Sequence, residues 1–288
     1  MQSPDAKETV KGVTIGGFLQ LLAVFTFLVL SQISLVFAPS SGVEIIRNSG
    51  VSKEVEHSAA IAVENVKAFF MDKYNVQLRR NIRIILTSDT DGYIQAQMKE
   101  HRISGEEAIR RGRTSSASSQ GSVIILNAGH PRLASSPSLI ATIAHEVVHQ
   151  FQDQLTNGKM SGLEWLTEGM AGIIAVQLTE DWGGKSLASY KKYCLQEIGA
   201  AAALPGLAEL RTSKQWRASL DKYGASVTYR IAEVAVLELQ SSTGWDAFVL
   251  YYQLVNQAAD KGLVFERNFG VTLDNFEHQF TEKLMTGK

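Results

Sequence analysis

The chain has 288 residues, of which 45% are hydrophobic, and its formal net charge is −1. A chain of this length and composition can bury one sizeable core, so a single folded domain is the simplest expectation. The near-zero charge, without a long basic block, argues against a nucleic-acid partner, and the single cysteine, Cys194, excludes an internal disulfide framework.

The N-terminal region contains one long apolar segment. No charged residue lies between Gly12 and Val43, and residues 13–38 are strongly apolar. A segment of about 25 residues is long enough to span a bilayer and exceeds the roughly 7–15 apolar residues of a signal-peptide core. We therefore predict a short tail over residues 1–12, a transmembrane helix over 13–38 and a linker over 39–51.

A cleaved signal peptide is the alternative interpretation of this segment. Val36-Phe37-Ala38 suits signal peptidase, but Pro39 directly after it disfavours cleavage. We therefore favour a single-pass membrane protein with a short N-terminal tail inside, which puts residues 52–288 outside the cytoplasm. Cleavage would instead release a secreted protein.

The segment after the linker predicts a small sheet with helices. Ser52–Tyr74 has the apolar spacing of an amphipathic helix, Ile82–Leu86 and Val123–Leu126 are short apolar strands, and Asp89–Gly92 has turn chemistry. The polar, arginine- and serine-rich stretch Ser104–Ser122 predicts a mobile loop. The chain after Gly158 is essentially helical in pattern. We therefore expect an α+β fold. In this fold a small twisted sheet with helices packs against a mainly helical C-terminal half, and a cleft lies between them.

A helix beginning near Ser136 carries His145-Glu146-Val147-Val148-His149. Residues four apart lie on one face of a helix, so His145 and His149 can both direct an imidazole at one Zn²⁺ ion. Glu146 can then reach a water at the metal and act as its general base. The alternative is a pair of buried histidines without a metal. Polar side chains along the whole helix exclude a membrane span.

A third ligand is expected on the next helix, about Leu163–Leu178. Eighteen residues separate His149 from Glu168, which is enough for a turn and a returning helix. The small residues Ala171 and Gly172, one turn after Glu168, would let this helix approach the first one closely. The alternative is that Glu168 is an ordinary solvated carboxylate.

The chain resembles the gluzincin metallopeptidases in one motif. This motif is His-Glu-x-x-His followed after eighteen residues by Glu168, which lies within Trp165-Leu166-Thr167-Glu168-Gly169-Met170-Ala171. The context is similar to the aminopeptidase N-like branch and to peptidase MA-like domains, and thermolysin-like enzymes share the plan. The resemblance implies a zincin-like fold over residues 52–288, one Zn²⁺ per chain held by His145, His149 and Glu168, and Glu146 as the catalytic base.

The same resemblance implies a tyrosine that hydrogen-bonds the oxyanion of the tetrahedral intermediate, just before a later helix. Tyr223 matches this position best and Tyr229 is the second candidate. The alternative for either ring is helix packing. The Gly-x-Met-Glu-Asn segment that holds the substrate amine in aminopeptidase N-like enzymes is missing. The position of the thermolysin-like aspartate that orients a zinc-binding histidine is Gly172.

Two hypotheses follow. The first is a membrane-anchored zinc peptidase that hydrolyses a peptide or protein substrate, as an endopeptidase because the amine-binding segment is missing. Val123–Leu126 would offer a sheet edge to the extended substrate. The second is a non-catalytic, membrane-tethered zincin-fold scaffold that binds a partner. The presence of both histidines and both glutamates favours the enzyme. The sequence indicates neither the identity of the substrate nor an oligomeric state.

Overall fold

The computed structural model describes residues 42–159 and 162–286 of a chain that divides into two units, residues 1–39 and 40–288. The predicted tail, the predicted transmembrane helix over residues 13–38 and the first residues of the linker lie outside the described residues. Among the residues that are described, no helix is both long and apolar enough to cross a membrane.

A mixed four-stranded sheet forms the core of the first half, in the order β1-β2-β4-β3. Three strands are parallel, and β3 pairs antiparallel with β4. The bounds of the strands are Val43–Arg47 for β1, Ile82–Thr87 for β2, Ala117–Gln120 for β3 and Val123–Asn127 for β4. The predictions for β2 and β4 are thus confirmed to within one residue. The expected linker over residues 39–51 is wrong at β1, where alternating side chains in Val-Glu-Ile-Ile-Arg form a half-buried edge strand.

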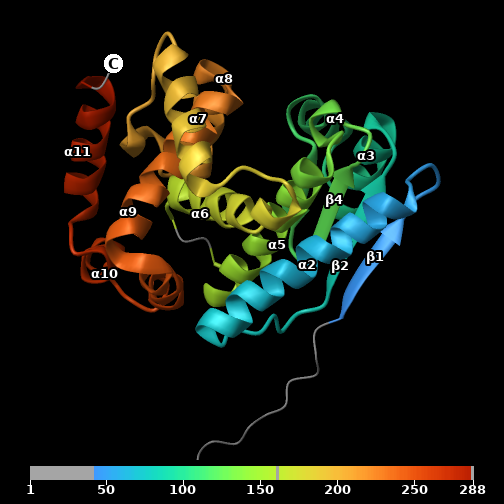
Figure 1. Ribbon diagram of the computed structural model, residues 1–288, viewed down its shortest axis with the longest axis horizontal. Coiled ribbons are helices and arrows are strands. Elements are labelled where there is room, and N and C mark those ends of the chain that lie inside the picture. The colour runs from blue at the N-terminus through green and yellow to red at the C-terminus, as the bar shows by residue number, and fades with distance from the viewer. Residues whose placement is uncertain (1–41, 160–161, 287–288) are drawn as a thin grey trace, which may run out of the picture. The chain divides into compact units, whose positions relative to one another are not determined.

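Helices cover both faces of this sheet because successive strand residues point to opposite sides. Ile84 and Ile124 join the main core, which α2 (Lys53–Tyr74) and α5 (Ser136–Leu155) share, whereas Ile85 and Ile125 pack on the other face. That second face is covered by α3 (Thr90–Ala96), which continues into the π-helix η1 (Gln97–His101). Figure 1 shows α2 running across the strands.

Two local predictions in this half are wrong. The predicted turn at residues 89–92 is the start of α3, because the Asp89 carboxylate accepts the amide N–H of Gly92 at 2.8 Å as a helix cap. The predicted loop over residues 104–122 contains α4 (Gly105–Thr114) and strand β3. Ser104 caps α4, and Glu107 pairs with Arg110 and Arg111 one turn later, so the charged stretch is a helix held by its own ion pairs.

The second half is helical, and helix α9 is its centre, packed against α6, α7, α8 and α10 (Figure 1). Its kink lies at Gly244, where the backbone is not helical (φ 75°). The bounds are Glu164–Gln177 for α6, Leu187–Ala200 for α7, Ser213–Tyr223 for α8, Ala225–Leu254 for α9, Lys261–Phe269 for α10 and Leu273–Thr286 for α11. Three short 3₁₀ turns lie at Pro131–Leu133, Glu180–Trp182 and Leu207–Leu210. The expected α+β class, with a small sheet and a mainly helical C-terminal half, is confirmed.

Glycines on α6 allow it to lie close to α9. A Cβ atom at Gly169 would lie 2.5 Å from the carbonyl oxygen of Ala232, and one at Gly172 would lie 2.5 Å from Glu233 Oε1. Such distances are far inside van der Waals contact. The small face of α6 at Gly172 therefore meets α9 and not α5, which corrects the partner expected from the sequence.

Candidate metal centre

Helix α5 places two imidazoles side by side. Its start is fixed by Ser135, whose hydroxyl accepts the amide N–H of Ser138, and its apolar side is buried, with Ile143 and Val147 fully enclosed. Burial of that side leaves His145 and His149 on a neighbouring face, where their Nε2 atoms are 3.0 Å apart and their rings meet edge to face at 4.6 Å. The helical spacing thus produces the arrangement that the sequence predicted.

Helix α6 brings Glu168 to the same point. Its Oε2 lies 3.1 Å from His145 Nε2 and 3.6 Å from His149 Nε2. The three side chains are 16–19% exposed, so they are partly buried and still open to solvent. Among the described residues, these three form a group of histidines and acids whose geometry could hold a metal ion.

The separations of these atoms can be compared with a tetrahedral metal site. Zinc with bonds of about 2.0–2.1 Å keeps its ligand atoms about 3.3 Å apart. The observed separations of 3.0, 3.1 and 3.6 Å fall on both sides of that value. Two imidazole nitrogens and one carboxylate are also a donor set that zinc takes in hydrolases, with the fourth position left for water. The three side chains could therefore hold a metal ion, and Zn²⁺ stays a prediction for this chain.

Gln152, which was not among the residues expected at this site, orients one of the imidazoles. Its Oε1 accepts a hydrogen bond from His149 Nδ1 at 2.7 Å, while its Nε2 donates to the Thr167 carbonyl at 2.9 Å. The second bond fixes the direction of the amide, so Nδ1 must carry a proton, and Nε2 is the nitrogen that can bind a metal once it has lost its own proton. The signal was available, because residues three apart lie side by side on a helix.

The charges of the group are strongly coupled in the metal-free protein. Burial acts to lower the pKa of His149, but the carboxylate of Glu168 outweighs it and raises that pKa to about 9. In the opposite sense, burial acts to raise the pKa of Glu168, and the charges and hydrogen bonds of His149 and His145 hold it below its ordinary value. The site therefore holds a proton that a bound cation would displace.

Glu146 lies beside the three convergent side chains without being one of them. Burial, followed by the charge of Glu168, raises the pKa of its carboxyl, and the two imidazoles partly oppose that effect. A carboxylate with a raised pKa binds a proton more readily, which suits a group that must accept and then release one.

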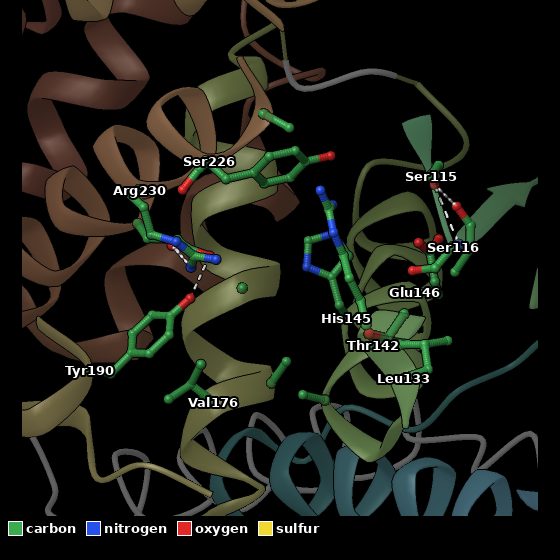
Figure 2. Close-up of a pocket in the computed structure, with 18 of the residues that line it drawn as sticks. Ser115, Ser116, Leu133, Thr142, His145, Glu146, Val176, Tyr190, Ser226 and Arg230 are labelled. Atoms are coloured by element: carbon green, nitrogen blue, oxygen red, sulfur yellow. Dashed lines mark hydrogen bonds and ion pairs between the residues drawn. The ribbon is translucent and has the colours of Figure 1, made fainter. Parts of the chain in front are cut away.

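Two cavities meet at this group. One has a volume of about 570 Å³ and the other about 530 Å³, and His145, Glu146 and Tyr229 line both. Figure 2 shows the first cavity, with His145 and Glu146 on one wall and Tyr190 and Arg230 on the opposite wall. The second cavity also includes His149 and Glu168. The candidate site therefore lies in the middle of a cleft.

The structure brings Tyr229, and not Tyr223, to this cleft. The Tyr229 ring centroid lies 6.3 Å from that of His145, and burial, followed by the charges of Glu168 and Glu146, raises the pKa of its phenol well above the ordinary value. Tyr223 ends α8, its hydroxyl donates to Glu209 at 3.4 Å, and it lines neither cavity. The two rings diverge because Gly224 (φ 84°) breaks the chain between α8 and α9. Of the two candidate tyrosines, Tyr229 is therefore the one that lies at the cleft.

A carboxylate from α9 fills the space beside Gly172. Glu233 is 4% exposed, accepts the hydroxyl of Tyr190 at 3.0 Å, pairs with Arg230, and lines the same cavity as His145. Burial raises the pKa of Glu233 even though Arg230 opposes it. No local sequence signal points to Glu233. It lies far along the chain from His145, and only the packing of α9 on α6 brings it to the cavity.

Comparison with protein-family models, with curated proteins and with solved structures found no match to this chain.

Proposed function

We propose that this protein is a zinc-dependent peptidase of gluzincin type with a zincin-like fold, anchored in a membrane by residues 13–38. The observation that carries the proposal is the convergence of His145, His149 and Glu168 in a cleft where Glu146 stands beside them. A pair of satisfied core histidines would not place two Nε2 atoms and a carboxylate oxygen around one point that is open to solvent.

The residues around that point have separate tasks. Bound zinc supplies a Lewis acid that lowers the pKa of water to about 7. The Glu146 carboxylate takes a proton from the attacking water and delivers it to the leaving amine. The phenol of Tyr229, kept protonated by its raised pKa, donates a hydrogen bond to the oxygen on which negative charge develops. Gln152 holds the ring of His149 in one tautomer.

Substrate backbone is expected at strand β3. From the sequence we expected Val123–Leu126 to offer this edge, but β4 has neighbours on both sides, β2 and β3, so its backbone groups are already paired. In the described sheet β3 is one of the two edge strands, and Ala117, Ser118 and Ser119 line the cavity that contains His149. An extended peptide added to this edge is bound through its main chain and needs no free terminus. We therefore propose an endopeptidase.

Metal analysis and peptide cleavage of the full-length protein in detergent test this function together. The purified protein should bind one zinc ion, and His145→Ala, His149→Ala or Glu168→Ala should abolish that binding. A peptide library should yield internal cleavage products, and acetylation of the N-terminus of a good substrate should leave its rate nearly unchanged. Full zinc occupancy in the Glu168→Ala protein would remove Glu168 from the ligand set. Zinc binding without any hydrolysis would favour the second hypothesis, a membrane-tethered scaffold.

A further inference from the structure

Glu164, the first residue of α6, also faces the cleft. It lines the cavity of about 530 Å³ that also contains His149 and Glu168. Glu164 lies one helical turn before Glu168, so their Cβ atoms are about 5–6 Å apart on the same face of α6. A group bound to Glu164 would therefore lie within one side-chain length of the proposed reaction centre.

Glu164 lacks the arginine partner that Asp153 and Glu107 have in the same cavity. Asp153 pairs with Arg80, and Glu107 pairs with Arg110. Among the described residues, the Glu164 carboxylate has one hydrogen-bond partner, the neutral hydroxyl of Ser213, at 3.0 Å, and no ion pair.

The surroundings disfavour the negative charge on this side chain. Burial, followed by the charge of Glu168, raises the pKa of Glu164, and the Ser213 hydroxyl together with the charges of His149 and Arg217 opposes the shift only in part. A carboxylate that merely completes the first turn of a helix is stabilised by the helix dipole, which would lower its pKa. A cation placed in the cavity beside Glu164 would remove the cost of this unpaired charge.

Helix α8 supplies a wall beside this carboxylate. Ser213, Trp216, Arg217 and Leu220 lie at helical spacing on one face of α8, and all four line the cavity. The half-buried Leu220 side chain offers an apolar surface against which the methylene groups of a lysine or arginine can pack, whereas the Trp216 ring is only 4% exposed and packs against Tyr229. Arg217 is exposed and forms no ion pair with Glu164 among the described residues, although its charge acts to lower the pKa of that carboxyl.

We propose that Glu164 determines specificity by binding a cationic group of the peptide substrate, an ammonium or a guanidinium, next to the scissile bond. The inference rests on the proposed peptidase function and adds the substrate class to it. A basic side chain and a free N-terminal amine share this chemistry, and the endopeptidase proposal favours the side chain.

Matched peptides distinguish these sources. One acetylated series carries lysine, arginine or glutamine at each position in turn, and one glutamine-containing peptide is compared with and without its acetyl group. With full-length protein, kcat/KM for the best basic peptide should exceed that of its glutamine counterpart by about tenfold or more, the effect of one charge-assisted hydrogen bond. In Glu164→Gln, which keeps the Ser213 contact, this ratio should fall close to one. A preference for the free amine over its acetylated form, lost in Glu164→Gln, would assign the amine as the cation.

Asp153→Asn is the matched control, because it removes the same charge from the same cavity at a residue already paired with Arg80. It should retain the preference for basic peptides. Equal losses in Asp153→Asn and Glu164→Gln would show a general electrostatic effect and overturn the inference, as would an unchanged ratio in Glu164→Gln. Binding can also be measured without hydrolysis. The same peptides are titrated into the Glu146→Gln protein and into the Glu146→Gln, Glu164→Gln double variant, and fluorescence anisotropy gives the ratio of affinities for the basic and the glutamine peptide. Failure to cut any peptide would then refute the peptidase alone, whereas binding without a basic preference would refute the role of Glu164.

Discussion

Replacement of Gln152 by leucine tests whether the hydrogen bond to His149 prepares the metal centre. Leucine is of similar size but removes the acceptor that lies 2.7 Å from His149 Nδ1 and the donor that lies 2.9 Å from the Thr167 carbonyl. Loss of such an orienting partner typically costs 10–100-fold in metal affinity, or about 1.4–2.8 kcal/mol. We expect Gln152→Leu to bind zinc correspondingly more weakly. The loss of these buried hydrogen bonds should also lower the free energy of unfolding of the metal-free protein by about 1–3 kcal/mol.

Competition for zinc with a chromophoric chelator measures this affinity, and urea unfolding of the metal-free protein measures stability separately. Gln154→Leu is the control, because Gln154 lies two residues further along α5 and hydrogen-bonds only the segment at Gln77 and Arg79, at 2.8 and 2.6 Å. It should lower stability and leave zinc affinity unchanged. Wild-type zinc affinity in Gln152→Leu would refute the orienting role, and equal losses of affinity in both variants would show that only general destabilisation is at work.

Four further predictions concern the base, the titration of His149 and the packing of α6 on α9. Glu146→Gln should keep the fold and the zinc but lower turnover by several orders of magnitude, since an amide cannot accept the proton; near wild-type turnover would contradict the mechanism. Because the metal-free pKa of His149 is raised to about 9, zinc binding should release a proton and strengthen about tenfold per pH unit up to that pH, as calorimetry in buffers of different ionisation enthalpy would show. By the same linkage, the stabilisation that His149 gives the metal-free protein is complete below pH 6.5 and is lost as the pH rises through about 9, so its melting temperature should fall over that range unless zinc is bound. Gly169→Ala should destabilise by about 1–3 kcal/mol in urea unfolding through its clash with the Ala232 carbonyl, whereas Gly199→Ala, with open space around it, should not; equal stabilities would refute the close contact of α6 and α9.

The periodicity of the helices was enough to predict the central part of the site. His145 and His149 share a face because four residues complete about one helical turn, and this holds in any fold that keeps α5 helical. Glu168 lies on the next helix, after a short connection. Because few arrangements of two helices joined in this way are possible, its approach to the two histidines could also be predicted. The sheet strands β2 and β4 were likewise evident as short apolar runs, whereas β1 and β3, half-buried edge strands with polar residues, were not.

Tertiary packing decided what local patterns leave open. Tyr229 and not Tyr223 lies beside His145, because the chain breaks at Gly224 before α9. The edge proposed for substrate is β3 and not β4, because the strand order is a property of the whole sheet. Glu233 reaches the space beside Gly172 through the packing of α9 on α6. These contacts join segments that are far apart in the chain. They are stabilised by the burial of side chains from several helices, which a short stretch of sequence does not reveal. The sequence by itself therefore determined the candidate ligands and base, and the tertiary structure alone decided which distant side chains surround them.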